Sequence, residues 1–172
     1  MQITNMRIVK LLLLQLLLLL TATVNAQNLR AAVNKVTEDY FNTRKAIEAG
    51  NATKVTESSQ GFIWDMRAIR VNDMNDAQHK QWFSHMDKLM AASRGVSQGR
   101  NIEVQKQQFS DLSKQFFETL KLFNLNKLPI YKLSCNGSVW LTQSTTVTNP
   151  YVSKTDKNKK CGNIDGILNA GK

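Results

Sequence analysis

The sequence is poor in the residues on which many classes of protein depend. Of its 172 residues, only two are cysteine, two histidine, two proline and eight glycine. So few glycines and prolines exclude collagen-like and linker-like chains, and two cysteines cannot build a disulfide-rich scaffold or a four-thiolate zinc site. Two histidines cannot supply a three-histidine catalytic metal site. Apolar residues still make up 42% of the chain, which is enough for one compact domain.

Sequence motifs of catalysis are also missing. There is no glycine-rich phosphate loop, no nucleophile elbow and no His-Glu-x-x-His zinc signature. We therefore expect a protein that is not an enzyme.

The charge is strongly basic, with 23 Lys and Arg against 13 Asp and Glu and a formal net charge of +10. Only Lys154, Lys157, Lys159 and Lys160 form a cluster. No aromatic residues interleave with that cluster as they do in nucleic-acid platforms, so we expect no nucleic-acid partner.

The first 26 residues have the three parts of a secretory signal peptide. Arg7 and Lys10 precede a leucine run over residues 11–20, and small residues follow at 24–26. The run is too short for a membrane span, and no cysteine at the junction indicates a lipid anchor. We predict a periplasmic or secreted protein whose single mature domain covers 27–172, with no membrane span in the mature chain.

Four stretches place apolar residues at steps of three and four, the pattern of amphipathic helices. The first runs from Leu29 to Ile47 and is followed by Gly50, a helix end, and Asn51, a cap for the next helix. The other three run from Ala52 to Ile69, His79 to Val96 and Ile102 to Phe123. Short links between them favour an antiparallel up-down four-helix bundle.

After Pro129 the apolar period changes to two. Asn136-Gly137 between two apolar runs is a strong hairpin signal, because both turn positions require positive φ. We therefore expect residues 131–172 to form a short β-hairpin and a loop that cap one end of the bundle.

The predicted topology also suggests a site. In such a bundle the start of the third helix and the end of the fourth lie at the same end, so we expect His79 and Met74 near Cys135 there, with Cys161 returning in the tail. Imidazole, thiol and thioether groups suit copper or zinc. The alternative is a disulfide between Cys135 and Cys161, which an oxidising compartment favours. The sequence leaves both open.

Part of the chain resembles an uncharacterised secreted bacterial domain family, found alone or fused to periplasmic adaptor subunits of heavy-metal efflux pumps. The matching positions lie mainly between Ala77 and Leu168. They are Ile102, Gln105, Lys106, Phe109, Leu112, Ser113, Tyr131, Cys135, Trp140, Leu141, Asn149, Pro150, Tyr151, Cys161 and Gly162.

Two departures from the family pattern concern metal ligands. The family shows Cys-Pro-Met where this chain has Cys135-Asn136-Gly137, and a Met shortly before its final Cys-Gly where this chain has Lys159-Lys160. The resemblance implies a metal-handling ancestry, whereas both expected methionines are absent.

Two functions follow as expectations. The first is a copper-type metal-binding accessory protein that serves a periplasmic efflux or envelope partner. The second is an envelope interaction module with a structural disulfide and no metal.

Overall fold

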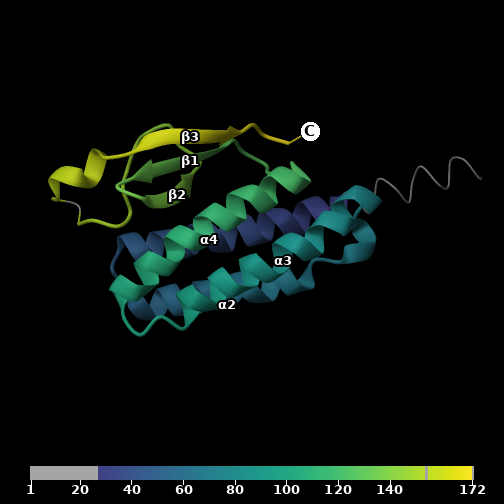
Figure 1. The fold of residues 1–172 in the computed structure, drawn as a ribbon, viewed down its shortest axis with the longest axis horizontal. Helices are drawn as coiled ribbons and strands as arrows, with labels where there is room; N and C mark the ends of the chain where they lie inside the picture. Colours follow the sequence, from purple (N-terminus) through teal and green to yellow (C-terminus); the bar gives the residue numbers. More distant parts are fainter. Residues whose placement is uncertain (1–26, 154, 172) are drawn as a thin grey trace, which may run out of the picture.

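The structure is a computed structural model, which describes residues 27–153 and 155–171. It contains four helices packed side by side and a three-stranded antiparallel sheet at the C-terminal end (Figure 1). Residues 27–48 are helical and form the described part of the first helix. The others are α2 (Ala52–Ala68), α3 (Asp76–Ser97) and α4 (Ile102–Phe123). The predicted fold class is confirmed, whereas the predicted signal peptide at 1–26 lies outside the described residues.

The predicted apolar stripes form the core of the bundle. Nearly all their members are buried, and the largest fully buried side chains come from all four helices and from the sheet. Phe116 of α4 lies at the centre, with its ring 5.2 Å from Tyr40 and 5.1 Å from Phe62. The exception is His79, which begins the third stripe and is exposed.

Asparagines begin three of the helices. The side chains of Asn51, Asn75 and Asn101 each accept a hydrogen bond from the backbone N–H three residues later. This satisfies a donor that the first turn of a helix would otherwise leave unpaired. Before the first of these caps, Gly50 ends a helix with φ at +67°, as predicted.

A short 3₁₀ turn, η1 (Val71–Asp73), connects α2 to α3. Among the helices of residues 27–153 and 155–171, none combines the length and the apolar character needed to cross a membrane.

The C-terminal sheet consists of β1 (Ile130–Cys135), β2 (Ser138–Thr142) and β3 (Asn163–Leu168), in the order β2-β1-β3. Asn136 and Gly137 make the β1–β2 turn with φ of 50° and 81°, which confirms the predicted hairpin. The third strand goes beyond the predicted hairpin and loop. It pairs antiparallel with the free edge of β1, and its register shifts between Lys132 and Leu133.

The sheet lies between the bundle and a loop. Ile130 and Leu141 belong to the bundle core, whereas Leu133, Cys135 and Trp140 form a second buried cluster. That cluster is covered by residues 143–153 and 155–162, which we call the covering loop. The tail therefore has a helical layer on one side and polypeptide chain without strands on the other.

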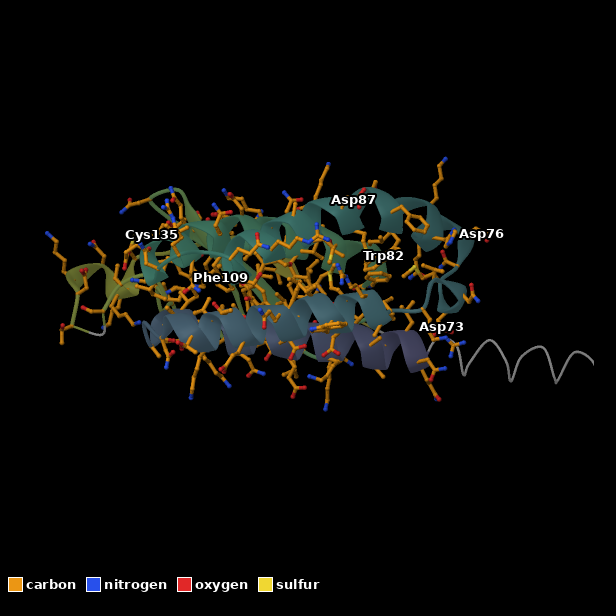
Figure 2. The ribbon with its side chains drawn as sticks, turned by 90° about the horizontal axis from the view of Figure 1, so that it is seen from below. Asp73, Asp76, Trp82, Asp87, Phe109 and Cys135 are labelled. Atoms are coloured by element: carbon orange, nitrogen blue, oxygen red, sulfur yellow. A yellow bond between two sulfur atoms is a disulfide. The ribbon has the colours of Figure 1, made fainter. Side chains whose placement is uncertain are left out.

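The direction of β1 differs from the expectation that placed Cys135 beside the start of the third helix. Cys135 and Asp76, the first residue of α3, lie at opposite ends of the molecule (Figure 2). The reason is that β1 runs back along α4. Six extended residues span about 20 Å, more than half of the roughly 33 Å length of a 22-residue helix.

Candidate functional site

The two cysteines form a disulfide. Cys135 at the end of β1 is bonded to Cys161, which lies 26 residues later and directly before β3, and their Cα atoms are 5.8 Å apart. Cys135 is buried, and Cys161 packs on the same cluster. The bond ties the end of the covering loop to the sheet. A disulfide is consistent with an oxidising, extracytoplasmic location.

Trp140 is the centre of the cluster beneath the disulfide. It lies on β2 opposite Leu133, is fully buried, and has Tyr151 against its indole at 6.1 Å between ring centroids. Gly162 lies against the same ring, where an added Cβ would come within 2.9 Å of two indole carbons. Because only a residue without a Cβ allows this approach, the glycine next to Cys161 is a packing requirement.

The motif Asn149-Pro150-Tyr151 anchors the covering loop. The buried Asn149 side chain accepts a hydrogen bond from the backbone N–H of Tyr151 at 3.0 Å. The Lys159 ammonium donates to the Asn149 carbonyl at 3.0 Å and to Glu48, at the end of the first helix, at 2.9 Å. Pro150 is buried. The positions listed for the resemblance in this motif therefore hold the loop in place.

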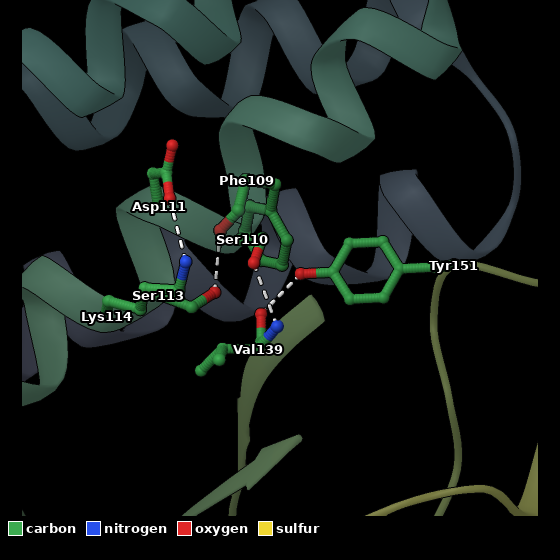
Figure 3. A network of polar contacts seen from close by, with 7 residues as sticks. All are labelled: Phe109, Ser110, Asp111, Ser113, Lys114, Val139 and Tyr151. Carbon is green, nitrogen blue, oxygen red and sulfur yellow. Dashed lines mark hydrogen bonds and ion pairs between the residues drawn. The ribbon is translucent and has the colours of Figure 1, made fainter. Parts of the chain in front are cut away.

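One edge of the sheet is closed by hydroxyl groups. On β2, the N–H of Val139 donates to Ser110 Oγ at 2.9 Å and the N–H of Leu141 donates to Tyr40 Oη at 2.9 Å. The Tyr151 hydroxyl donates to the Val139 carbonyl, beside the contact of Ser110 (Figure 3). With Tyr40 of the first helix, three segments of the chain reach this edge. Burial raises the pKa of both tyrosines, which keeps their hydroxyls protonated.

The proposed metal ligands are not brought together. His79 lies in the first turn of α3, exposed, with its ring in edge contact with Phe83 at 5.2 Å. Met74 lies just before α3 and packs against the bundle core. Both lie within three residues of Asp76, which is at the opposite end of the molecule from Cys135 (Figure 2). The sulfur of Cys135 is bonded to Cys161. This donor set does not fit a copper or zinc ion.

The other described side chains do not form a metal site either. Within 27–153 and 155–171, no three His, Cys, Asp or Glu side chains are grouped so that they could hold a metal ion.

A charged cluster with one buried carboxylate, Asp39, was missed from the sequence. Lys35 of the first helix lies 3.1 Å from Asp39 and 3.3 Å from Asp65 of α2. One oxygen of Asp39, Oδ2, is buried without a hydrogen-bond donor. Desolvation and the neighbouring Asp65 carboxyl raise the pKa of Asp39 to about 6, whereas the interaction with Asp39 lowers the pKa of Asp65. The spacing of Lys35 and Asp39 could have signalled an ion pair, but Asp65 joins them only through packing.

Comparison with known proteins identifies the helical part. The model of a protein family of unknown function, DUF3347, matches residues 22–127, more than half of the chain. The chain belongs to the DUF3347 family. No curated protein and no solved structure matches the sequence.

The DUF3347 match overlaps the region of the resemblance over residues 77–127. It covers the four helices, including the first two, and ends before β1 begins at Ile130. The disulfide, Trp140 and the Asn149-Pro150-Tyr151 motif therefore lie outside the matched DUF3347 region.

Proposed function

We propose that this protein is a non-enzymatic, extracytoplasmic interaction module in which the Cys135–Cys161 disulfide is structural. The observation that carries the proposal is the state of the two sulfurs. They are bonded to each other, under a loop and against a fully buried tryptophan. A sulfur in a disulfide is not a thiolate, and thiolates are the form in which cysteine binds metals.

Membership of DUF3347 does not by itself favour a reaction or a ligand, because that family has no known function. The metal-handling alternative would require the disulfide to be reduced and His79 to move from the far end of the bundle. Cys135 is buried and Cys161 is half-buried, and a disulfide that is partly shielded from solvent and closes a loop resists reduction by compartment thiols better than an exposed one. The interaction module needs no such rearrangement.

Surface composition also supports an interaction role. Among residues 27–153 and 155–171, five large apolar side chains are exposed: Trp64, Phe83, Leu128, Ile164 and Ile167. Exposed aromatic and aliphatic side chains are typical of surfaces that contact other proteins. Two of these five lie on β3, on the side of the molecule where the disulfide holds the strand in place.

The test is a count of free thiols and bound metal on protein purified without reductant or chelator. We expect no free thiol and no copper or zinc. About one equivalent of either metal that disappears in Cys135→Ser would contradict the proposal and support the metal-binding accessory. Trp64→Ala, which leaves the cysteines untouched, is the control for nonspecific loss of metal.

A further inference from the structure

The two edge strands of the sheet, β2 and β3, differ in the hydrogen bonding of their outer backbone groups. The β2 edge is closed by the hydroxyls of Ser110, Tyr40 and Tyr151. On β3, the described part of the chain contributes no side-chain hydrogen bond, and its backbone pairing is with β1. The outer N–H and C=O groups of an edge strand are a template for another strand. This sheet therefore has one closed edge and one open edge (Figure 1).

The open strand is held at both ends. At its start, Cys161 is bonded to Cys135. After its end, the N–H of Gly171 donates to the Asn126 carbonyl at 2.9 Å, and the Asn126 side chain donates to the Asn169 carbonyl at 2.9 Å. A strand anchored on either side loses little conformational entropy when a second strand pairs with it. Its edge is therefore organised for binding before any partner arrives.

The outward face of β3 is apolar. Ile164 pairs with Leu133 and Ile167 pairs with Tyr131, so all four side chains lie on the face that carries the covering loop. The loop covers Leu133, but it leaves Ile164 43% and Ile167 56% exposed. A strand added beside them would place alternate side chains against these two isoleucines.

The surroundings of the edge are basic. The 3₁₀ turn η2 (Lys157–Lys160) directly precedes Cys161 and β3, and Lys157 and Lys160 are exposed. Lys159 is already paired with Glu48. The strand itself carries one acidic residue, Asp165. The exposed Lys157 and Lys160 make the η2 end of the edge positively charged. Such an edge attracts an extended segment that carries acidic residues.

We propose that the outer edge of β3 binds an extended acidic segment of a partner protein by strand addition, with apolar residues of that segment against Ile164 and Ile167. This inference rests on the proposed interaction role and names its partner class. Backbone hydrogen bonds would supply affinity, and the isoleucines and lysines would supply selectivity.

The test uses a capped nine-residue peptide of alternating valine and threonine with a glutamate at each end. Titration into ¹⁵N-labelled protein should shift the amide signals of residues 163–168 and leave those of α2 unchanged. A peptide with lysine in place of both glutamates should bind about fivefold more weakly, because it meets like charge at η2. A peptide N-methylated at two successive central residues should not bind, because both its edges lose a donor.

Two protein variants complete the experiment. Ile167→Asp places a carboxylate on the apolar face of the edge, with the same charge as the glutamates of the peptide, and should weaken binding of the acidic peptide at least tenfold. Trp64→Asp makes the same change on α2, at a side chain 69% exposed, and should leave binding unchanged. The comparison of the peptides on the unmodified protein remains a valid test even if Ile167→Asp misfolds.

The outcomes separate the two proposals. Equal binding of acidic, basic and N-methylated peptides, or shifts outside residues 163–168, would overturn strand addition. So would a dimer in sedimentation that Ile167→Asp dissociates, because the occupant of the edge would then be a second copy of this chain. Blocked thiols without metal, found together with no peptide binding, would leave the interaction role standing without this partner class.

Discussion

The four-helix bundle and the C-terminal sheet differ in how they are stabilised. In the bundle, buried side chains from four helices form one continuous core in which aromatic rings such as Tyr40, Phe62 and Phe116 contact each other across helices. The sheet has a small core of its own around Trp140. The rest of its stability comes from its links to the bundle and to the covering loop. It is joined to the bundle by Ile130, Leu141 and hydroxyl groups, and to its covering loop by a disulfide.

The difference indicates where each region is vulnerable. Every turn of a helix adds another buried side chain, so the bundle distributes its stability over many contacts. A three-stranded sheet with one face under an irregular loop has fewer such contacts and depends on the closure of that loop. The family match divides the chain at the same place, because it covers the helices and ends before the sheet.

The largest effect is expected from the centre of the bundle. Phe116→Ala removes a ring that is 2% exposed. It should lower the free energy of unfolding by about 3–5 kcal/mol, because a cavity remains among the helices. Urea unfolding followed by far-ultraviolet circular dichroism measures it. Phe83→Ala, at a ring 56% exposed, should change the value by less than about 0.5 kcal/mol. Equal effects of the two variants would contradict the core assignment.

Loss of the disulfide should act mainly on the sheet. Replacing both Cys135 and Cys161 by serine removes a link across 26 residues, for which the chain-entropy estimate is about 3.5 kcal/mol. We expect faster hydrogen exchange in residues 130–168 and unchanged exchange in α2 and α3, measured by mass spectrometry. If the helices exchanged faster to the same extent, the two regions would be one cooperative unit and the comparison would fail.

Two glycines should respond in opposite directions to the same substitution. Gly162→Ala places a methyl group 2.9 Å from the Trp140 ring and from Val147, and should destabilise the sheet by about 1–3 kcal/mol. Gly61→Ala lies within α2, where the methyl group meets Asp39 at 3.8 Å, an ordinary contact. It should stabilise the protein by about 0.5–1 kcal/mol. Thermal unfolding of both variants checks the signs, and equal signs would contradict the packing described for Gly162.

The smallest effect concerns pH and belongs to the bundle alone. The Asp39 carboxyl has a pKa of about 6 when folded, against 3.8 for an unperturbed aspartate. Between these pH values the folded protein holds a proton that the unfolded chain has released, so this carboxyl lowers stability as the pH rises through that range. The lowered pKa of Asp65 opposes part of the effect.

Asp39→Asn should therefore raise the free energy of unfolding more at pH 7 than at pH 4. The difference should be on the order of 1 kcal/mol after solvent screening is allowed for. Urea titrations at the two pH values measure the difference. Asp111→Asn is the matched control, because its carboxylate is exposed and pairs with Lys114. A pH dependence that is the same in the Asp39 and Asp111 variants would contradict the raised pKa of Asp39 in the folded protein.

Local signals were read correctly because each depends on residues close in sequence. The helical stripes, the Gly50 helix end, the Asn51 cap and the Asn136-Gly137 turn all appear where predicted. The family match includes the helical positions of the resemblance, from Ile102 to Ser113, whereas its tail motifs lie outside the matched residues. Those motifs do meet around Trp140, where Tyr151, Cys161 and Gly162 converge.

The proposed metal site failed as a spatial prediction for one reason. The end of α4 was predicted correctly, but the direction of β1 after it was not. That direction places Cys135 at the opposite end of the molecule from Asp76, at the start of the helix that carries His79 (Figure 2). Nothing in the local sequence states whether a strand turns away from a helix or runs back along it. Burial of Ile130 and Leu141 against the helices decides it.

The amino-acid order by itself determined the elements of this protein, because periodicity, caps and turn residues act over a few neighbouring positions. Tertiary packing alone decided which distant groups meet: the carboxylates of Asp39 and Asp65, the hydroxyls that close β2, and the edge of β3 that stays open. These contacts depend on the burial of many side chains from separate segments, so no single stretch of the sequence determines them.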